Sequence, residues 1–352
     1  MTTSDALAPS FRVRVQGQNL PADAEADITH LTVHEDLDMP SMFTLRLINW
    51  DMARLKTTWS DADLFSPGAE VEIQMGYLGQ LQVVLTAEIT GLEPDFSAED
   101  IPTVTVRGYD RRHRLLRGRK TQSFIKMKDS DIAAKIASGV GLRPKTDPTN
   151  VTLEYVAQHN QTDLEFLQER AARLGYEVVV EDKTLFFRQR KNATRSVLKL
   201  DPASDLLEFS PRLSTMGQVS EVKVRGWDPT AKKPVEGTAS PSNQTTRMAG
   251  TSGGPEATKK AFGAASVAVV DRPVFSQAEA DQIARGQFNT QALAYVVGEG
   301  TCIGNAAMRA GIVVTMSGLG KRFSGDYYVT ATRHTFSSDG YRTGFTVHRN
   351  AT

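Results

Sequence analysis

One seven-residue pattern occurs twice in this chain. Val104–Asp110 reads Val-Thr-Val-Arg-Gly-Tyr-Asp and Val222–Asp228 reads Val-Lys-Val-Arg-Gly-Trp-Asp, so five of seven positions are identical and a sixth exchanges one aromatic residue for another. These residue types predict a strand, a glycine that permits a sharp bend or positive φ, an aromatic plug, and an aspartate bonded to its own turn backbone. Each copy ends a run of strand-like sequence, which favours two related β modules over a chance match. The residues of this structural repeat are Arg107, Gly108, Tyr109 and Asp110 in the first copy, and Arg225, Gly226, Trp227 and Asp228 in the second.

Apolar residues alternate with polar ones through the first hundred residues. The pattern is clear at Phe11–Val15 and Phe43–Leu47, and again at Val71–Met75, after which Gly76–Gly79 interrupts a run that resumes at Leu81. Such alternation with glycines between the runs is typical of half-buried antiparallel strands joined by hairpins. Five or more strands without a long helix predict a sandwich or barrel over residues 1–118.

The pattern changes over residues 119–195, where we predict a small α+β insert. Asp129 or Ser130 is placed to cap a short helix that ends near Gly139. Thr162 and Glu165 form a capping box for a second helix, which Gly175 ends in a left-handed conformation. A hairpin that turns at Asp182-Lys183 follows.

Strand-like sequence returns over residues 196–352, which we interpret as a second barrel. Residues 237–266 are rich in Gly, Ser, Thr, Ala and Pro and bury too little to offset their chain entropy, so we predict a mobile loop. A capping box at Ser276–Glu279 predicts a helix over about 276–294. The expected fold is therefore mainly β with an α+β insert, and contains two related antiparallel barrels.

Length and composition exclude several classes of protein. A chain of 352 residues exceeds the size of a typical single core, and its 41 basic residues balance 41 acidic ones, which disfavours a strongly basic DNA binder. No run approaches the roughly 18 apolar residues of a membrane helix, and no signal peptide is recognisable, so we expect synthesis in the cytoplasm. The single cysteine, Cys302, rules out an intrachain disulfide.

The patterns that could indicate catalysis or metal binding have simpler explanations. Gly250-Thr251-Ser252-Gly253-Gly254 matches the Gly-x-Ser-x-Gly nucleophile motif, but it lies in the predicted loop and not at a strand-to-helix turn. His30 and His34 would stand roughly 13 Å apart on a strand, too far to share a metal. Asp36 with Asp38, and Asp61 with Asp63, are interpreted as solvated turns. The sequence leaves glycosidase-type carboxylate pairs open, because the fold sets their separation.

His334 and one charge cluster have open interpretations, whereas a group of glycines is excluded as a nucleotide site. His334 lies in the closing strands, where a structural or interface role is favoured over a chemical one. Gly298, Gly300 and Gly304 do not fit the dinucleotide-binding spacing. The charge cluster consists of Arg107, Arg111, Arg112, Arg114, Arg117, Arg119 and Lys120. A subunit contact is favoured over nucleic acid for this cluster, with a plain solvated segment as the alternative to both. We predict no catalytic, cofactor-binding or metal-binding residue.

Four motifs in the same order resemble those of a known family. They are the repeat, the helix that begins at Thr162, the helix Ser276–Asp281, and the ending from Gly325 through His334 to Phe345. Together they resemble the phage late control D proteins, which are similar to the hub of myophage baseplates and to the hub part of VgrG-type spike proteins. The resemblance runs from about Phe11 to Asn350.

The resemblance implies a baseplate hub of a contractile tail or contractile injection system. It implies a homotrimer in which three chains present six barrels, a pseudo-sixfold ring between a sixfold inner tube protein and a threefold spike. Larger VgrG-type spikes continue into further domains, whereas this chain stops at Thr352, so we expect a separate spike or tip protein. Other baseplate components are expected partners, with nucleic acid only as passing cargo and no membrane insertion.

Two other functions compete with the hub. One is a tail-associated peptidoglycan hydrolase or cell-wall-binding module, which cell-wall lysis would reveal. The other is a monomeric carbohydrate-binding β protein, which the mass in solution would separate from a trimer.

Overall fold

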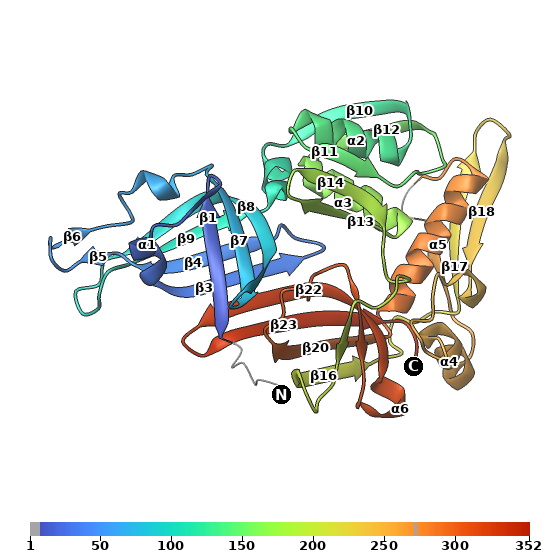
Figure 1. Ribbon diagram of the computed structural model, residues 1–352. Coiled ribbons are helices and arrows are strands. Elements are labelled where there is room, and N and C mark those ends of the chain that lie inside the picture. The colour runs from blue at the N-terminus through green and yellow to red at the C-terminus, as the bar shows by residue number, and fades with distance from the viewer. Residues whose placement is uncertain (1–7, 271–272) are drawn as a thin grey trace. The chain divides into compact units, whose positions relative to one another are not determined.

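The computed structural model describes residues 8–270 and 273–352 (Figure 1). The chain divides into two compact units. Unit 1 comprises residues 1–113, 301–310 and 331–345, and unit 2 comprises residues 114–300, 311–330 and 346–352. Three long strands contribute residues to both units: β20 (Val296–Ile303), β22 (Gly325–Ser337) and β23 (Gly340–Arg349). The three-way division at 118/119 and 195/196 stays a prediction, since contacts group two late segments with the N-terminal part.

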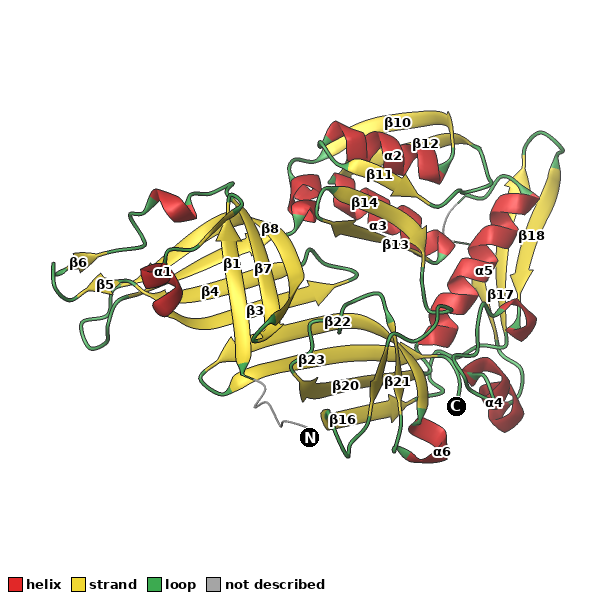
Figure 2. Cartoon of the chain, in the orientation of Figure 1, coloured by secondary structure: helices red, strands yellow, loops and turns green. Residues whose placement is uncertain are grey.

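Unit 1 is built mainly from strands (Figure 2). Its strands are joined in the order β22-β3-β4-β9-β8-β7-β1-β2. The alternation seen in the sequence becomes alternating burial: in β4, for example, Phe43, Leu45 and Leu47 are buried. The remaining elements of this unit are β1 (Pro9–Val15), β2 (Gln18–Asn19), α1 (Ala22–Ala26), β3 (Ile28–Asp36), β4 (Met42–Ile48), β5 (Trp50–Asp51), β6 (Lys56–Thr57), η1 (Asp63–Phe65), β7 (Glu70–Tyr77), β8 (Gln80–Asp95) and β9 (Thr103–Tyr109).

The sheet of unit 1 curls around its own core. Phe11 on β1 and Phe336 on β22 lie near opposite ends of the strand order, yet their ring centroids are 4.7 Å apart. The Tyr77 hydroxyl donates to the Gly304 carbonyl at 3.0 Å. No backbone ladder between β1 and β22 is found among the described residues, so the closed barrel stays a prediction.

The first part of unit 2 is the α+β insert, which has a core of its own. Helices α2 (Asp129–Gly139) and α3 (Asp163–Leu174) pack with five strands around Phe124, Leu167 and Phe187. The strands are β10 (Lys120–Met127), β11 (Arg143–Thr146), β12 (Leu153–Gln161), β13 (Tyr176–Glu181) and β14 (Thr184–Gln189), and η2 (Arg111–Leu116) leads into them from unit 1. The predicted hairpin is confirmed, with Asp182 at φ 49° in its turn.

Helix ends in the insert follow the sequence in one case and not in the other. Thr162 and Glu165 form the predicted capping box, and Gly175 has a left-handed φ of 68°. Neither Asp129 nor Ser130 caps α2, which begins after Lys128 without a side-chain cap. The Asp129 carboxylate is instead buried in a two-bond pair with Arg170, at 2.6 and 3.0 Å.

The rest of unit 2 contains a helix-covered sheet and the outer parts of the shared strands. Strands β17 (Glu221–Asp228), β18 (Lys233–Ala239) and β19 (Ser266–Val269) form a sheet against which α5 (Gln277–Leu293) packs. Ser276 accepts from the Glu279 amide, as predicted, but the Glu279 side chain accepts from Phe275 and not from Ser276. The other elements are β15 (Leu198–Leu200), β16 (Leu206–Leu213), η3 (Pro241–Asn243), α4 (Gly254–Phe262), β21 (Val313–Met316) and α6 (Gly320–Phe323).

The prediction of a mobile loop over residues 237–266 is wrong. The segment contains the end of β18, the short helix η3 and the nine-residue helix α4. Backbone pairing with the last residues of the chain holds its middle part: Gly254 N donates to Asn350 O at 2.9 Å. The segment compensates for its low hydrophobic content with such hydrogen bonds. No helix of the described part of the chain is long and apolar enough to span a membrane.

Candidate functional site

The two copies of the repeat end strands in different sheets. Arg107–Asp110 ends β9 and lies in unit 1, between two antiparallel neighbours, β4 and β8. Arg225–Asp228 ends β17 and lies in unit 2, where the neighbours are antiparallel β18 and parallel β19. The two copies therefore differ in the direction of the strands that pair with them, although the seven-residue motif is nearly the same.

Within the motif the two copies share four local features. The two valines of each copy are buried. Arg107 forms an ion pair with Glu93 at 2.8 Å, and Arg225 forms one with Glu236 at 2.7 Å, in both cases on a neighbouring strand. Each aspartate accepts from its own turn, as expected: Asp110 from Arg112 N at 2.8 Å, and Asp228 from Thr230 N at 2.9 Å.

The fourth shared feature is the glycine, Gly108 in the first copy and Gly226 in the second. Glycine is required at these positions for a reason other than the bend or positive φ that the sequence suggested. Neither Gly108 nor Gly226 has a positive φ. A Cβ at Gly108 would overlap the Phe43 ring and the Glu88 carbonyl, and one at Gly226 would overlap the carbonyl of Val274. Glycine is needed because another chain segment crosses close to the strand.

The aromatic position differs. Tyr109 is half-buried, whereas Trp227 is exposed, so the predicted aromatic plug is wrong for the second copy.

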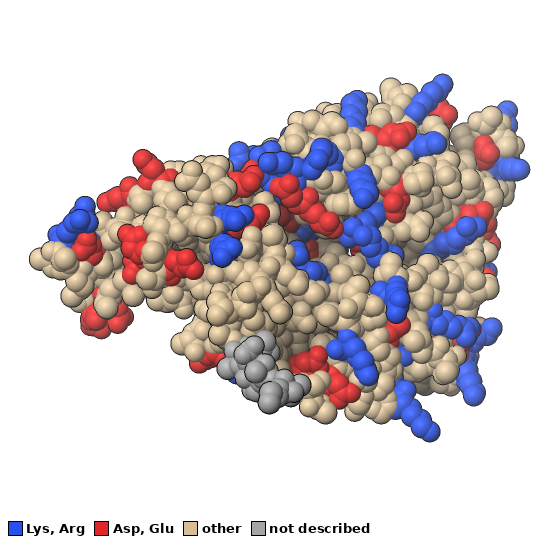
Figure 3. Space-filling view, viewed as in Figure 1, with Lys and Arg blue, Asp and Glu red and all other residues tan. Residues whose placement is uncertain are grey.

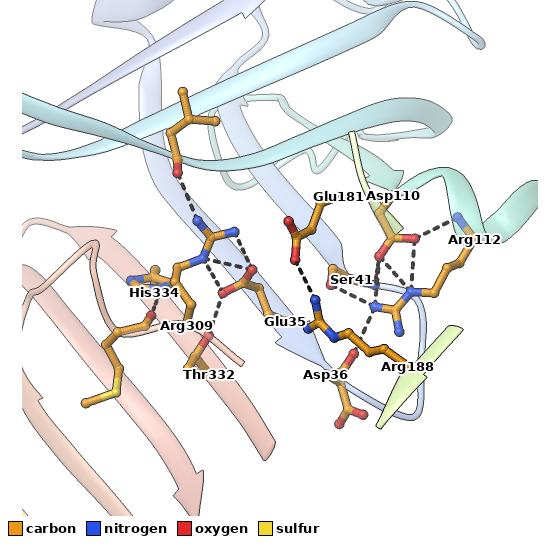
Figure 4. Close-up of polar contacts among 12 residues, drawn as sticks. Glu35, Asp36, Ser41, Asp110, Arg112, Glu181, Arg188, Arg309, Thr332 and His334 are labelled. Carbon is orange, nitrogen blue, oxygen red and sulfur yellow. Dashed lines mark hydrogen bonds and ion pairs between the residues drawn. The ribbon is translucent and has the colours of Figure 1, made fainter. Parts of the chain in front are cut away.

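Asp110 also anchors a buried charge network in unit 1 (Figure 4). Arg112 Nε donates to Asp110 Oδ2 at 2.9 Å, and Arg112 Nη2 donates to the Asp36 carbonyl at 2.8 Å and to Ser41 Oγ at 3.0 Å. Ser41 N donates to Asp110 Oδ2 at 2.7 Å. The network ties the connection between β3 and β4 to the end of β9, and it satisfies a guanidinium that is only 1 % exposed.

The basic cluster predicted from the sequence is not one continuous surface patch. Arg111 is buried between Glu70 and Glu88, and His113 Nε2 lies 2.8 Å from Glu88 Oε2. Further along, Arg119 pairs with Glu165 at 3.1 Å and Lys120 with Asp163 at 2.6 Å, both within unit 2. Arg111 and Arg112 therefore belong to the interior of unit 1. For the exposed remainder of the cluster, a subunit contact stays a prediction, with nucleic acid and a plain solvated segment as the alternatives.

A second network surrounds Glu35 in unit 1 (Figure 4). Arg309 donates to both Glu35 oxygens, with Nε at 2.8 Å from Oε2 and Nη2 at 2.6 Å from Oε1. Thr332 Oγ1 donates to Glu35 Oε2 at 3.1 Å, and Arg309 Nη1 donates to the Val83 carbonyl at 3.0 Å. A two-bond pair of this kind orients both side chains more strictly than one hydrogen bond.

His334 is a neutral histidine inside unit 1. Its Nε2 lies 2.9 Å from the Met308 carbonyl, which only accepts, so Nε2 carries the proton. Its Nδ1 accepts from the Tyr341 hydroxyl at 2.8 Å and lies 3.2 Å from Thr343 Oγ1. Burial lowers the pKa of His334 to about 4, and burial raises the pKa of Tyr341 well above 10. This geometry gives His334 a structural role.

Unit 2 has a comparable network at Glu177. Arg188 Nε donates to Glu177 Oε1 at 2.8 Å, and Tyr328 donates its hydroxyl proton to Glu177 Oε2 at 2.6 Å. Arg188 Nη1 reaches Glu181 at 3.4 Å (Figure 4). Burial, together with the Glu177 carboxylate, raises the pKa of Tyr328 well above its ordinary value. The network joins β13 and β14 to β22.

The Gly-x-Ser-x-Gly segment serves packing. Ser252 N donates to Thr352 O, and Thr352 N donates to Ser252 O, both at 3.0 Å. Gly254 begins α4 against the Tyr295 ring, where a Cβ would overlap it. Ser252 lacks the positive φ that would mark a strained turn. The segment pairs with the end of the chain through backbone hydrogen bonds and one isolated bridge between Gly253 and Ala351.

The other candidate ligands also bond locally. His30 and His34 both lie on β3, and His30 Nε2 is 2.8 Å from Thr32 Oγ1. Asp36 Oδ1 accepts from Asp38 N at 2.7 Å, which makes that pair a turn. No group of three or more His, Cys, Asp or Glu side chains suited to a metal ion is found in residues 8–270 and 273–352.

Comparisons with solved structures agree with one another on the fold. The 43 kDa tail protein of prophage MuSo2 from Shewanella oneidensis superposes with a TM-score of 0.69 at 12% identity, covering 97% of this chain and 98% of that one. The tail protein from Neisseria meningitidis MC58 superposes with a TM-score of 0.67 at 15% identity, covering 97% of this chain and 96% of that one. The E. coli c3393 protein superposes with a TM-score of 0.63 at 14% identity, covering 96% of this chain and 77% of that one. It is a component of the type VI secretion system with structural similarity to T4 bacteriophage tail proteins.

These likenesses show that the chain has the fold of phage tail proteins. A comparison with curated proteins found no match. A family model described as the Alg8 N-terminal domain matches residues 5–338. Because this match takes in nearly the whole sequence, the chain belongs to the Alg8 N-terminal domain family.

Proposed function

We propose that this chain is a structural hub of a contractile tail or contractile injection system. The observation that carries the proposal is the fold, which matches two tail proteins, one of them from a prophage, over nearly their whole lengths, and also a type VI secretion component. The order of motifs that resembles the late control D proteins supports the same assignment. The hub is the part of such a particle that joins an inner tube to a spike.

The hub acts as a homotrimer, in which each chain supplies two related β modules. The shared local structure of the repeat supports this: paired valines, a cross-strand arginine, a sterically required glycine and a turn-capping aspartate occur in both copies. Three chains with two modules each match a sixfold tube on one side and a threefold spike on the other. An obligate contact of this kind buries more than about 2,000 Å².

The role is mechanical and not enzymatic. Buried ion networks at Asp110, Glu35 and Glu177 cross-link strands within each unit, and such networks suit a part that transmits load. The expected neighbours are the inner tube protein, a spike and other baseplate components.

Imaging of the intact particle tests the proposal. The expected result is density for three copies of this chain around the particle axis, between the tube and the spike. A single copy, or a peripheral position without threefold symmetry, would refute it. Purified chain incubated with peptidoglycan provides an independent test, in which robust lysis would replace the hub with the hydrolase alternative.

A further inference from the structure

Two neighbouring hairpin tips of unit 1 expose large apolar side chains. One tip connects β5 to β6 and the other connects β8 to β9. The exposed fractions are 72 % for Met52, 71 % for Leu55, 61 % for Phe96 and 58 % for Ile101. Ile48 pairs with Thr103 across β4 and β9, and Asn49 N donates to the Pro102 carbonyl at 2.7 Å, so the two tips leave the sheet side by side. Exposed apolar groups gathered in this way mark a contact surface.

Helix α1 belongs to the same end of the unit. Ile48 N donates to the Asp27 carbonyl at 2.8 Å, and Trp59 Nε1 donates to the Asp27 carboxylate at 2.7 Å. We define the hairpin end as residues 21–27, 49–65 and 93–103.

The charge of unit 1 is concentrated at the hairpin end. Unit 1 holds 19 acidic and 11 basic residues, a net charge of −8. The hairpin end holds ten acidic and two basic residues, again −8, so the remainder of the unit is balanced. The acidic residues are Asp23, Glu25, Asp27, Asp51, Asp61, Asp63, Glu93, Asp95, Glu99 and Asp100, and the basic ones are Arg54 and Lys56. Figure 3 shows acidic side chains gathered around α1 and the tips.

Unit 2 carries the complementary charge. It holds 30 basic and 22 acidic residues, a net charge of +8. Residues 114–145 alone hold nine basic and two acidic residues, a net charge of +7. Basic side chains are correspondingly frequent over the insert in Figure 3.

The insert also exposes an apolar centre. Ile125 and Tyr155 face each other across β10 and β12 and are 64 % and 61 % exposed. Lys126 and Lys128 follow Ile125 in sequence, and Lys135 Nζ lies 5.5 Å from the ring centroid of Phe124. We define the basic insert face as residues 114–145 with Tyr155. Both surfaces therefore have an apolar centre within charge of one sign, and the two signs are opposite.

We propose that the hairpin end of one copy docks on the basic insert face of a neighbouring copy of this chain. The inference rests on the proposed homotrimer and names the contact that closes it. Two hairpin ends would repel each other, so this contact joins unlike surfaces, and such head-to-tail contacts form rings when the rotation closes. Opposite charges steer the encounter, and the apolar centres supply the buried area.

Charge reversal tests the pairing. The acidic variant is Asp95→Lys, Glu99→Lys and Asp100→Lys, all at exposed positions of the β8–β9 tip. The basic variant is Lys126→Glu, Lys128→Glu and Lys135→Glu. Light scattering on the full chain over a concentration series measures the trimer fraction. We expect each variant alone to weaken association roughly 10- to 100-fold. The variant that combines all six substitutions should associate with an affinity within about threefold of the parent.

A matched control reverses three exposed lysines of unit 2 outside the basic insert face: Lys232→Glu, Lys233→Glu and Lys259→Glu. This control should associate like the parent, and circular dichroism should show the same fold for all variants. A parent that trimerises while the two reversal variants do so equally well would overturn the inference and leave the hub intact. If the variant with all six substitutions does not regain association, the inference is also overturned, because the hairpin end would then bind a surface other than the basic insert face. A parent that stays monomeric would refute both the trimer and this contact.

Discussion

Acid should weaken unit 1 through the buried His334 in particular. The imidazole donates through Nε2 to Met308 O and accepts at Nδ1 from Tyr341, so a second proton would remove that acceptor inside the core. Burial lowers the pKa of His334 to about 4, from an ordinary value of 6.5. The folded state therefore takes up a proton less readily than the unfolded chain.

The sign and size of the effect follow from this difference. A depressed histidine pKa contributes stability that is fully present above pH 6.5 and is lost as the pH falls toward 4. Each pKa unit corresponds to about 1.4 kcal/mol, so His334 accounts for a loss on the order of 2–3 kcal/mol between neutral pH and pH 4.5.

Urea unfolding at several pH values, followed by tryptophan fluorescence, measures this loss. Trp50 and Trp59 both lie in unit 1 and report on its unfolding. His334→Gln keeps one donor and one acceptor but does not titrate, so its free energy of unfolding should fall on the order of 2–3 kcal/mol less than that of the parent over the same range. His159→Gln, at an exposed position of β12, is the control and should follow the parent. Parallel profiles for the parent and His334→Gln would refute the assignment of a neutral, buried imidazole.

Three further predictions concern stability, each measured as the free energy of unfolding in urea. Gly108→Ala should lower the free energy of unfolding by at least about 2 kcal/mol, because the added Cβ overlaps a neighbouring strand. Gly91→Ala is the control and should be near neutral, because its Cβ meets open space. Equal effects of the two substitutions would contradict the steric argument. Arg112→Leu should lower the free energy of unfolding by about 3–5 kcal/mol, because it leaves the buried Asp110 carboxylate without its cation. Arg225→Leu removes an exposed ion pair and should cost less than about 1 kcal/mol. A larger cost for Arg225→Leu would disprove the distinction between buried and exposed pairs. Thr162→Ala should cost about 1 kcal/mol through loss of the capping box, and Thr162→Ser should restore most of it; no recovery would argue against the cap.

Local patterns in the sequence predicted local structure well. The alternating runs became strands, and the hairpin at Asp182-Lys183 was confirmed. The left-handed Gly175 and the capping box at Thr162 also appear as expected. These features depend on residues within a few positions of one another, so their physics is visible without knowledge of the fold.

Long-range partners account for the failures. Asp129 does not cap α2 because Arg170, 41 residues later, binds its carboxylate. The cationic run was divided among carboxylates such as Glu70 and Glu165, which no local pattern connects to it. Residues 237–266 are ordered because the end of the chain pairs with them.

The sequence by itself determined the alternating strands, the capping box at Thr162 and the recurrence of the motif at Arg107 in the motif at Arg225. Only the tertiary structure decided why Gly108 and Gly226 are glycines, which cations are buried, and which tips remain exposed. The physical reason is that propensity and capping act along the chain, whereas steric exclusion and desolvation depend on segments that meet only after folding.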